Sequence, residues 1–208
     1  WRFRSVYRWG GPADRTEAYR QKADWIEVAH EVTPDRPSEL LLFEGLTLLV
    51  GEGSSGGAKE SAIFPGLEWL TAQERSSSTL DAHPPINLRA APHPLKVTVP
   101  HMAVVTEGHL VGLMWDPLQE WARGAAMPTA RFASPNWLHG QENHLLALTA
   151  PSAGEWVREN EWLAHTPYPV AAGETIRLSG QVTVARTGDV LAAIDLYLER
   201  YGLPDPGD

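Results

Sequence analysis

The chain has 208 residues, and 17 basic against 26 acidic side chains give it a formal net charge of −9. This balance argues against the broad cationic surface of a protein that binds nucleic acid or an anionic membrane. The chain has no cysteine, which excludes disulfides, thiolate zinc sites and cysteine nucleophiles.

The sequence shows no membrane or export signal. No apolar run reaches the roughly 18 residues of a membrane span, and the first residues lack a charged-then-apolar leader. The chain begins at Trp1 and not at a methionine, so a processed product and an excised piece both remain open. Cytoplasmic and secreted locations therefore remain open too.

The first periodic segment permits two interpretations. Residues Ala13–Val32 have the charge density and apolar spacing of one amphipathic helix, with Ala18 and Trp25 on its inner face. The alternative is that the second half, Trp25–Val32, is an alternating strand. The sequence leaves both open.

The middle of the chain predicts short strands. Gly and Pro, 18 and 17 residues, are spread along the whole length and break it into pieces, as many strands joined by turns require. The expected strands are Glu39–Val50, Ala62–Leu70, Lys96–Gly108, His109–Trp115, Ala130–Asn136, His144–Ala150 and Thr175–Arg186. Glu107-Gly108 predicts a hairpin turn, and Gly180 in mid-strand predicts a bulge or a close backbone approach.

The clearest helix follows at the end of the chain. Thr187 or Asp189 can cap it, apolar residues recur at helical spacing, and Gly202 with Pro204 ends it. The predicted fold is therefore mainly β, a large antiparallel two-sheet β-sandwich with a C-terminal helix and few other helices. Residues 1–186 would form the sandwich, and residues 187–208 a helix and linker leading to a further domain.

Three segments are dense in polar side chains that could carry chemistry. Ser134–Leu148 crowds an indole, imidazoles, carboxamides and a carboxylate ahead of an apolar run. If this segment is extended, His139, Gln141 and Asn143 share one face. The spacing of His139 and His144 is not that of a zinc helix, so we predict no metal site and no cofactor.

The second segment contains Glu68 and Glu74 followed by the serines at 76–78, which predict a turn whose hydroxyls satisfy the backbone. The third, around Glu159 and Glu161, is either a solvated turn or part of a site.

The chain contains nine tryptophans, whereas a protein of this length and ordinary composition has roughly three. Indole rings stack on the apolar faces of sugars. We expect the first and third polar segments to meet as the wall of one concave face.

Several stretches resemble a galactose-mutarotase-like β-sandwich, also called the supersandwich domain. They are "FPGLEWL", the strand–turn–strand ending in "GLMWDP", the Asn/His-rich turn, and the "P-Y-x-x-x-x-G-E" entry to a long strand. The resemblance implies a carbohydrate-facing sandwich that stands in front of a helical (α/α) toroid in glycoside hydrolases and polysaccharide lyases. In epimerases with this fold a histidine acts as acid and a glutamate as base, but their motif matches no position here.

We therefore expect an accessory, non-catalytic sandwich domain of a carbohydrate-active enzyme. Its expected partners are a carbohydrate and a C-terminal helical catalytic domain, with no nucleic acid and no membrane. The residues expected to contact the sugar are Asn136, Trp137, His139, Gln141, Asn143, Trp115, Glu68 and Glu74. One alternative is a stand-alone sugar epimerase or mutarotase using a His/Glu pair, for which His144, Glu159 and Glu161 are candidates by residue type alone. Another is a structural interaction module without a ligand.

Overall fold

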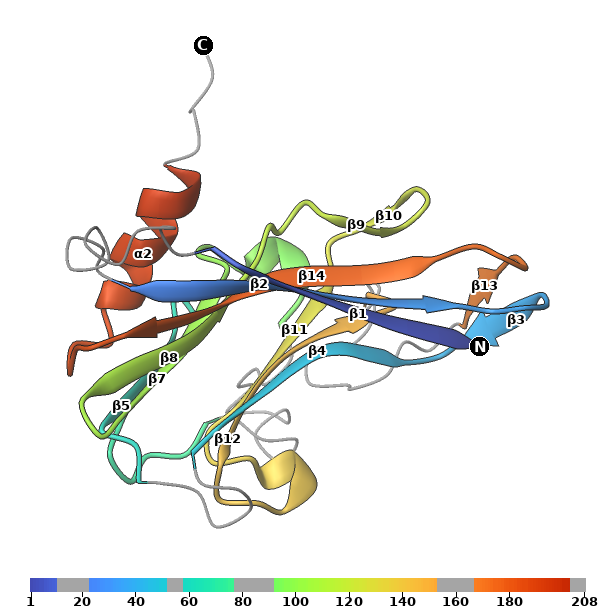
Figure 1. Cartoon of the computed structure of the whole chain (residues 1–208). Coiled ribbons are helices and arrows are strands. Elements are labelled where there is room, and N and C mark those ends of the chain that lie inside the picture. Colours follow the sequence, from blue (N-terminus) through green and yellow to red (C-terminus); the bar gives the residue numbers. More distant parts are fainter. Residues whose placement is uncertain (11–22, 52–57, 77–91, 153–166, 203–208) are drawn as a thin grey trace.

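The structure is a computed structural model, and it describes residues 1–10, 23–51, 58–76, 92–152 and 167–202 (Figure 1). The first half contains strands β1 Arg2–Trp9, β2 Asp24–Thr33, β3 Ser38–Leu40, β4 Phe43–Val50, β5 Ser61–Phe64, β6 Glu68–Thr71 and β7 His101–Thr106. The second half contains β8 His109–Met114, β9 Glu120–Ala122, β10 Ala125–Ala126, β11 Thr129–Ala133, β12 His144–Ala150, β13 Tyr168–Val170 and β14 Ile176–Ala185. Helix α2, Ala192–Tyr201, follows the last strand, and short 3₁₀ turns lie at Pro94–Lys96 and Trp137–His139.

The strands form one large sheet, one small sheet and two short pairs. The seven-stranded sheet has the order β1-β2-β14-β8-β7-β5-β6, and its neighbouring strands are antiparallel. The three-stranded sheet has the order β11-β12-β4, and the pairs are β10-β9 and β13-β3. The prediction of a mainly β, antiparallel two-sheet sandwich with a C-terminal helix is confirmed.

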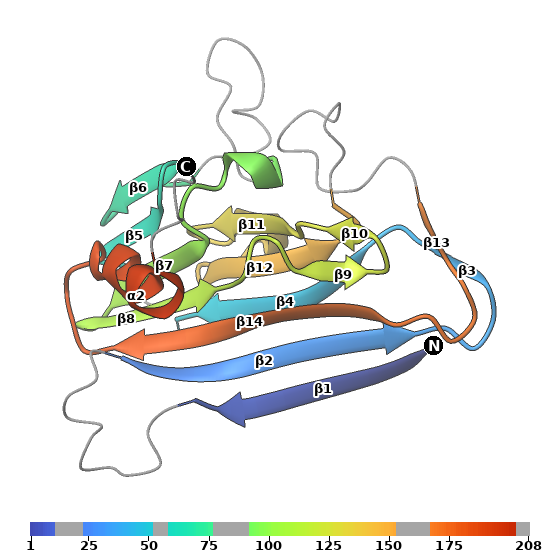
Figure 2. The ribbon, with the colours of Figure 1, turned by 90° about the horizontal axis from the view of Figure 1, so that it is seen from above.

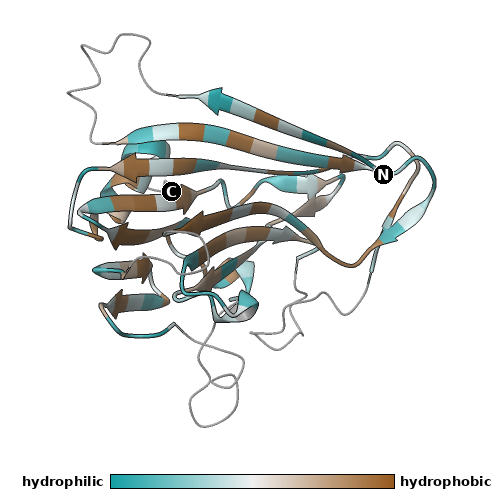
Figure 3. Ribbon diagram, turned by 60° about the horizontal axis from the view of Figure 1, so that its bottom comes forward, coloured by the Kyte–Doolittle hydropathy of each residue, from teal (hydrophilic) through white to brown (hydrophobic). Residues whose placement is uncertain are grey.

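The inner face of the large sheet packs on the small sheet (Figure 1), and the view from above shows the strand order of the large sheet (Figure 2). Alternate residues of β14 supply this face, and Ile176 and Leu178 are fully buried. They share one apolar cluster with Leu146 and Leu148 of β12. The strands of this interior are the most hydrophobic parts of the ribbon, whereas β1 and β2 alternate in hydropathy (Figure 3).

Helix α2 packs on the outer face of the large sheet, against β7 and β8. Its buried residues Ala193 and Leu196 join Val105, Leu110 and Ala185 in a second apolar cluster. The helix ends at Gly202, whose φ of 74° places it in the region that glycine tolerates. The predicted helix is therefore confirmed, with Asp189 accepting a bond from the Leu191 N–H at 2.9 Å just before it.

Two details of the strand prediction are confirmed. The β7–β8 hairpin turns at Glu107 and Gly108, both with positive φ, 51° and 67°, as a two-residue hairpin turn requires. A Cβ on Gly180 would lie 3.0 Å from the Met114 carbonyl oxygen, so glycine here serves a close backbone approach and not a bulge.

Other boundaries differ from the prediction. The helical interpretation of Ala13–Val32 is wrong for its second half, which is strand β2, while residues 11–22 lie outside the described residues. Tertiary pairing on both sides of β2 decides the matter, because β1 and β14 both bond to it. The segment Glu39–Val50 is two strands, and Ala62–Leu70 is a β5–β6 hairpin. Strand β1 at the edge of the large sheet was not predicted.

Candidate functional site

The loop between β11 and β12 is held together by its own carboxamides. Asn136 and Asn143 are 0% and 1% exposed, and the Asn136 Nδ2 donates to Asn143 Oδ1 at 2.9 Å. Asn143 Nδ2 donates to Gln141 Oε1 at 2.8 Å. His139 Nδ1 donates to Asn136 Oδ1 at 3.1 Å. The structure thus brings together four predicted sugar contacts, but the buried carboxamides of Asn136 and Asn143 are hydrogen-bonded within this group.

The base of this loop is a buried hydroxyl–imidazole pair. Ser134 Oγ is hydrogen-bonded to His144 Nδ1 at 2.9 Å, and the two residues are 0% and 3% exposed. The Ser134 N–H donates to Ser76 Oγ at 2.8 Å, so the hydroxyl of Ser76 satisfies a backbone group as predicted. His144 is therefore enclosed, and it lacks the open approach that an acid acting on a sugar needs.

The two tryptophans that were expected to contact the sugar pack against apolar residues of the protein. Trp137 packs on the small cluster Ala133, Leu145 and Ala147. Trp115 is 2% exposed in the main core, edge-on to Phe64, so its indole is unavailable to a ligand and the expectation that it contacts sugar is corrected.

The two acids of the second polar segment lie on β6 and shortly after it. Glu68 is half-buried on β6. Glu74 accepts from the Thr71 N–H at 2.6 Å and from its hydroxyl, and these bonds lower the pKa of the Glu74 carboxyl. Glu159 and Glu161 lie outside the described residues, as does the expected meeting of the first and third polar segments.

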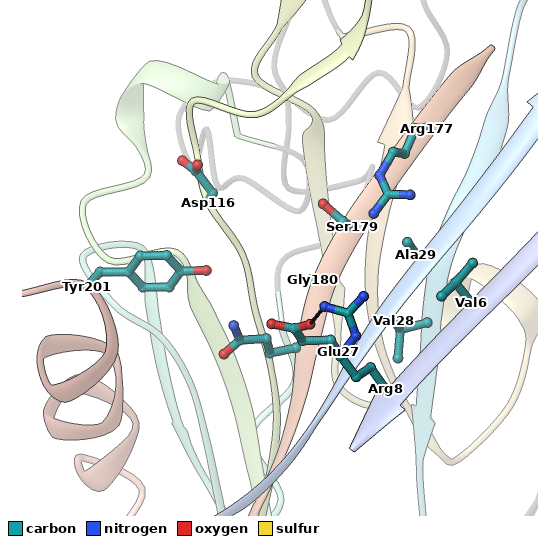
Figure 4. A pocket seen from close by; sticks show the side chains of 11 residues that line it. Val6, Arg8, Glu27, Val28, Ala29, Asp116, Arg177, Ser179, Gly180 and Tyr201 are labelled. Carbon is teal, nitrogen blue, oxygen red and sulfur yellow. Dashed lines mark hydrogen bonds and ion pairs between the residues drawn. The ribbon is translucent and has the colours of Figure 1, made fainter. Parts of the chain in front are cut away.

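A cleft of about 220 Å³ opens elsewhere, on the outer face of the large sheet. Its floor is formed by β1, β2 and β14, and its far side by Asp116 after β8 and Tyr201 at the end of α2 (Figure 4). The lining residues are Val6, Arg8, Glu27, Val28, Ala29, Asp116, Arg177, Ser179, Gly180, Gln181 and Tyr201.

Strand alternation places the charged side chains of the cleft together. Arg8 pairs with Glu27 in the β1–β2 register, and Glu27 pairs with Gln181 in the β2–β14 register. Residues directly opposite on antiparallel strands project to the same face of a sheet. Arg177 is opposite Glu31 on that face, four residues further along β2 from Glu27.

Two carboxylates, Glu27 in the cleft and Glu31 beside it, each form ion pairs with two guanidinium groups. Glu27 lies 3.4 Å from Arg8 Nη1 and 3.7 Å from Arg200 Nη2. Glu31 lies 2.5 Å from Arg177 Nη1 and 3.4 Å from Arg4 Nη1. An arginine has five N–H donors, so these contacts leave donor capacity on every guanidinium.

Neutral polar groups complete the cleft. The Gln119 carboxamide oxygen accepts from the Ser179 N–H at 2.9 Å and from its hydroxyl at 3.1 Å, which fixes Ser179 where β8 no longer pairs with β14. Gln181, in the amide orientation that satisfies its neighbours, accepts from Arg200 Nε at 2.9 Å.

Tyr201 supplies the aromatic side of the cleft and a hydroxyl donor. Burial raises the pKa of the Tyr201 phenol, and the nearby charge of Asp116 adds to the rise while Arg200 opposes it. The phenol therefore stays protonated at neutral pH. A ring that is 39% exposed can contact a ligand through its face while its hydroxyl donates.

The sequence prediction missed this cleft. A signal was present, because Arg4 and Arg8, like Glu27 and Glu31, are spaced by even numbers and share one face of a strand. The sequence permits both a helix and a strand over Ala13–Val32 and does not predict β1, so this shared face was not recognised.

No family model matches the chain, and no curated protein and no solved structure matches it either. Over the described ranges, no group of three or more His, Asp or Glu side chains is arranged to hold a metal ion. In the same part of the chain, no helix has the length and apolar character needed to cross a bilayer.

Proposed function

We propose that the chain is a carbohydrate-associated β-sandwich domain, an accessory part of a glycoside hydrolase-like protein that binds or supports a sugar. The observation that carries this proposal is the cleft over β2 and β14. Guanidinium, carboxylate, hydroxyl and carboxamide groups converge there beside the Tyr201 ring, and such groups read the hydroxyls of a sugar through paired donors and acceptors.

The size of the cleft limits the ligand. Its volume of about 220 Å³ is below the roughly 300–1,000 Å³ of pockets for drug-sized ligands. It accommodates one sugar unit better than several. A domain that holds one unit of a longer chain, next to a catalytic partner, fits this geometry and the resemblance to the supersandwich domains.

An accessory role is better supported than a stand-alone mutarotase. A mutarotase needs a histidine and a carboxylate that both face the sugar. His144 is 3% exposed and bonded to Ser134, and none of the described residues that line the cleft is a histidine. A purely structural module would leave the outward-facing donors of the cleft without a use.

Saccharide titration followed by calorimetry and tryptophan fluorescence tests this proposal. We expect binding of mono- or disaccharides to the wild-type chain, and an affinity roughly three- to tenfold lower in Tyr201→Ala, because the variant loses the aromatic contact. Tyr7→Ala is the matched control, since Tyr7 is 65% exposed and lies on the opposite face of the large sheet.

Two outcomes would contradict the proposal. One is the absence of saccharide binding at millimolar concentration, and the other is binding that Tyr201→Ala leaves unchanged. Polarimetry of fresh glucose and galactose separates the alternative: accelerated mutarotation that His144→Ala abolishes would favour the stand-alone enzyme. A coding region that continues past Asp208 into helical repeats would support the expected catalytic partner.

A further inference from the structure

The charges around the cleft are unlike those of the chain as a whole. Four guanidiniums, those of Arg4, Arg8, Arg177 and Arg200, stand against the carboxylates of Glu27, Glu31 and Asp116. Of the residues that line the cleft, Arg8 and Arg177 balance Glu27 and Asp116, so the lining is neutral in a protein with a formal net charge of −9. A neutral lining lets the two guanidiniums attract an anionic group that the chain as a whole would repel.

The arginines of the lining and the carboxylate of Asp116 lie on different sides of the cleft. Arg8 and Arg177 lie on one side of the cleft, whereas Asp116 and Tyr201 lie on the other (Figure 4). Glu27 and Glu31 each contact two arginines, whereas Asp116 is an acidic cleft residue for which the described part of the chain shows no ion pair with an arginine. Asp116 accepts from the Leu118 N–H at 2.8 Å and keeps its other acceptor sites.

From this polarity, and resting on the proposed function, we infer that the cleft binds an acidic sugar, a uronate unit whose carboxylate lies between Arg8 and Arg177. The planar guanidinium fork matches a carboxylate through two parallel hydrogen bonds. The sugar hydroxyls then face Asp116, Ser179 and the Tyr201 hydroxyl. A neutral sugar would leave to water the charge of those guanidinium donors that Glu27 and Glu31 do not use.

The experiment compares galacturonate and digalacturonate with galactose and galactobiose by titration calorimetry, with acetate at equal concentration as a further arm. We expect the acidic sugar to bind at least roughly tenfold more tightly than the neutral one at low salt, since charge-assisted hydrogen bonds are the stronger ones. The preference should shrink as salt rises, because the arginines are 48% and 75% exposed and are screened.

Arg177→Gln and Arg8→Gln should each lower the affinity for galacturonate severalfold, and the affinity for galactose by a smaller factor. Arg186→Gln is the matched control, because Arg186 is exposed and lies outside the cleft lining. Thermal unfolding of each variant shows whether it folds, and two independent cleft variants prevent one misfolded protein from deciding the result.

The outcomes separate the two proposals. If galactose binds as tightly as galacturonate, the inference is overturned while the proposed function stands. If acetate binds as tightly as galacturonate, the cleft is an anion site without sugar recognition, and the inference fails. If no saccharide binds, both fail.

Discussion

His101 lies 0% exposed between the large sheet and α2. Its Nδ1–H donates to the Ala193 carbonyl at 2.7 Å, so Nε2 is the acceptor for the Thr183 hydroxyl at 2.9 Å. A Cβ at position 112 would lie 2.4 Å from Nε2, which explains the glycine there. The imidazole is thus a neutral link between strand and helix, and burial lowers the pKa of His101 to about 4.

This burial predicts a pH-dependent stability. Between pH 6.5 and about 4 the unfolded chain takes up a proton on His101 and the folded chain does not, so the stability is present above pH 6.5 and is lost as the pH falls. The loss is about 1.4 kcal/mol per pH unit, or about 3 kcal/mol over the window. Urea unfolding of wild type and His101→Gln at several pH values measures it.

His101→Gln should lose the part of the pH dependence of the unfolding free energy that His101 causes. His109→Gln, at an exposed position, should keep it. Equal slopes in all three proteins would contradict the assignment. Carboxylates elsewhere contribute to each curve, so the difference between the curves is the quantity that carries the information.

At the scale of elements, α2 is attached to the sheet by few residues. Ala193 and Leu196 supply its buried side. Together with Val190, which precedes the helix, they form one apolar cluster with Ile63, Ala103, Val105, Leu110 and Ala185. An isolated helix of this length is marginal in water, so its stability comes from this docking. Arg200 near its end contacts the Trp25 ring at 5.3 Å and Glu27 at 3.7 Å.

Leu196→Ala should therefore lower the free energy of unfolding by about 2–4 kcal/mol, because it leaves a cavity between helix and sheet. Leu118→Ala is the matched control, since Leu118 is 73% exposed and should change stability by less than about 0.5 kcal/mol. Chemical denaturation followed by circular dichroism measures both. A similar effect of the two substitutions would mean that α2 does not depend on this contact.

The sequence predicted elements where local signals and tertiary pairing agree. Strand β12 was predicted with its observed bounds, because a continuous apolar run buried on both faces leaves no other choice. Strand β2 was ambiguous, since its alternating glutamates also suit a helix surface, and only its pairing with β1 and β14 resolves it. The expected strand Lys96–Gly108 begins only at His101, because a 3₁₀ turn occupies Pro94–Lys96.

The two sheets depend on one another at the scale of the whole molecule. One apolar cluster joins Phe64 and Trp115 of the large-sheet side to Phe132, Leu146 and Leu148 of the small sheet. A sheet with one apolar face needs a second layer to bury it. Neither sheet has a separate core on the inner side, so the described sandwich should unfold as a unit.

Leu148→Ala tests this coupling. We expect a loss of about 2–5 kcal/mol and a parallel shift of the transitions seen by far-ultraviolet circular dichroism and by tryptophan fluorescence. Transitions that separate in the variant would show that the sheets unfold independently.

The site was harder to predict than the fold. The sequence brought together Asn136, His139, Gln141 and Asn143 correctly as neighbours, but it could not tell that buried amides bond to one another and not to a ligand. That distinction depends on burial. The cleft collects residues from three strands, a turn and a helix that are up to nearly two hundred positions apart, and only strand register places them side by side.

One wall of the cleft belongs to helix α2 and not to the sheet. Tyr201 is the last residue of α2, while the other lining residues belong to the sheet and to the turn after β8. A tilt of α2 would therefore change the width of the opening, and a ligand that contacts both Tyr201 and β14 would hold the end of the helix against the sheet.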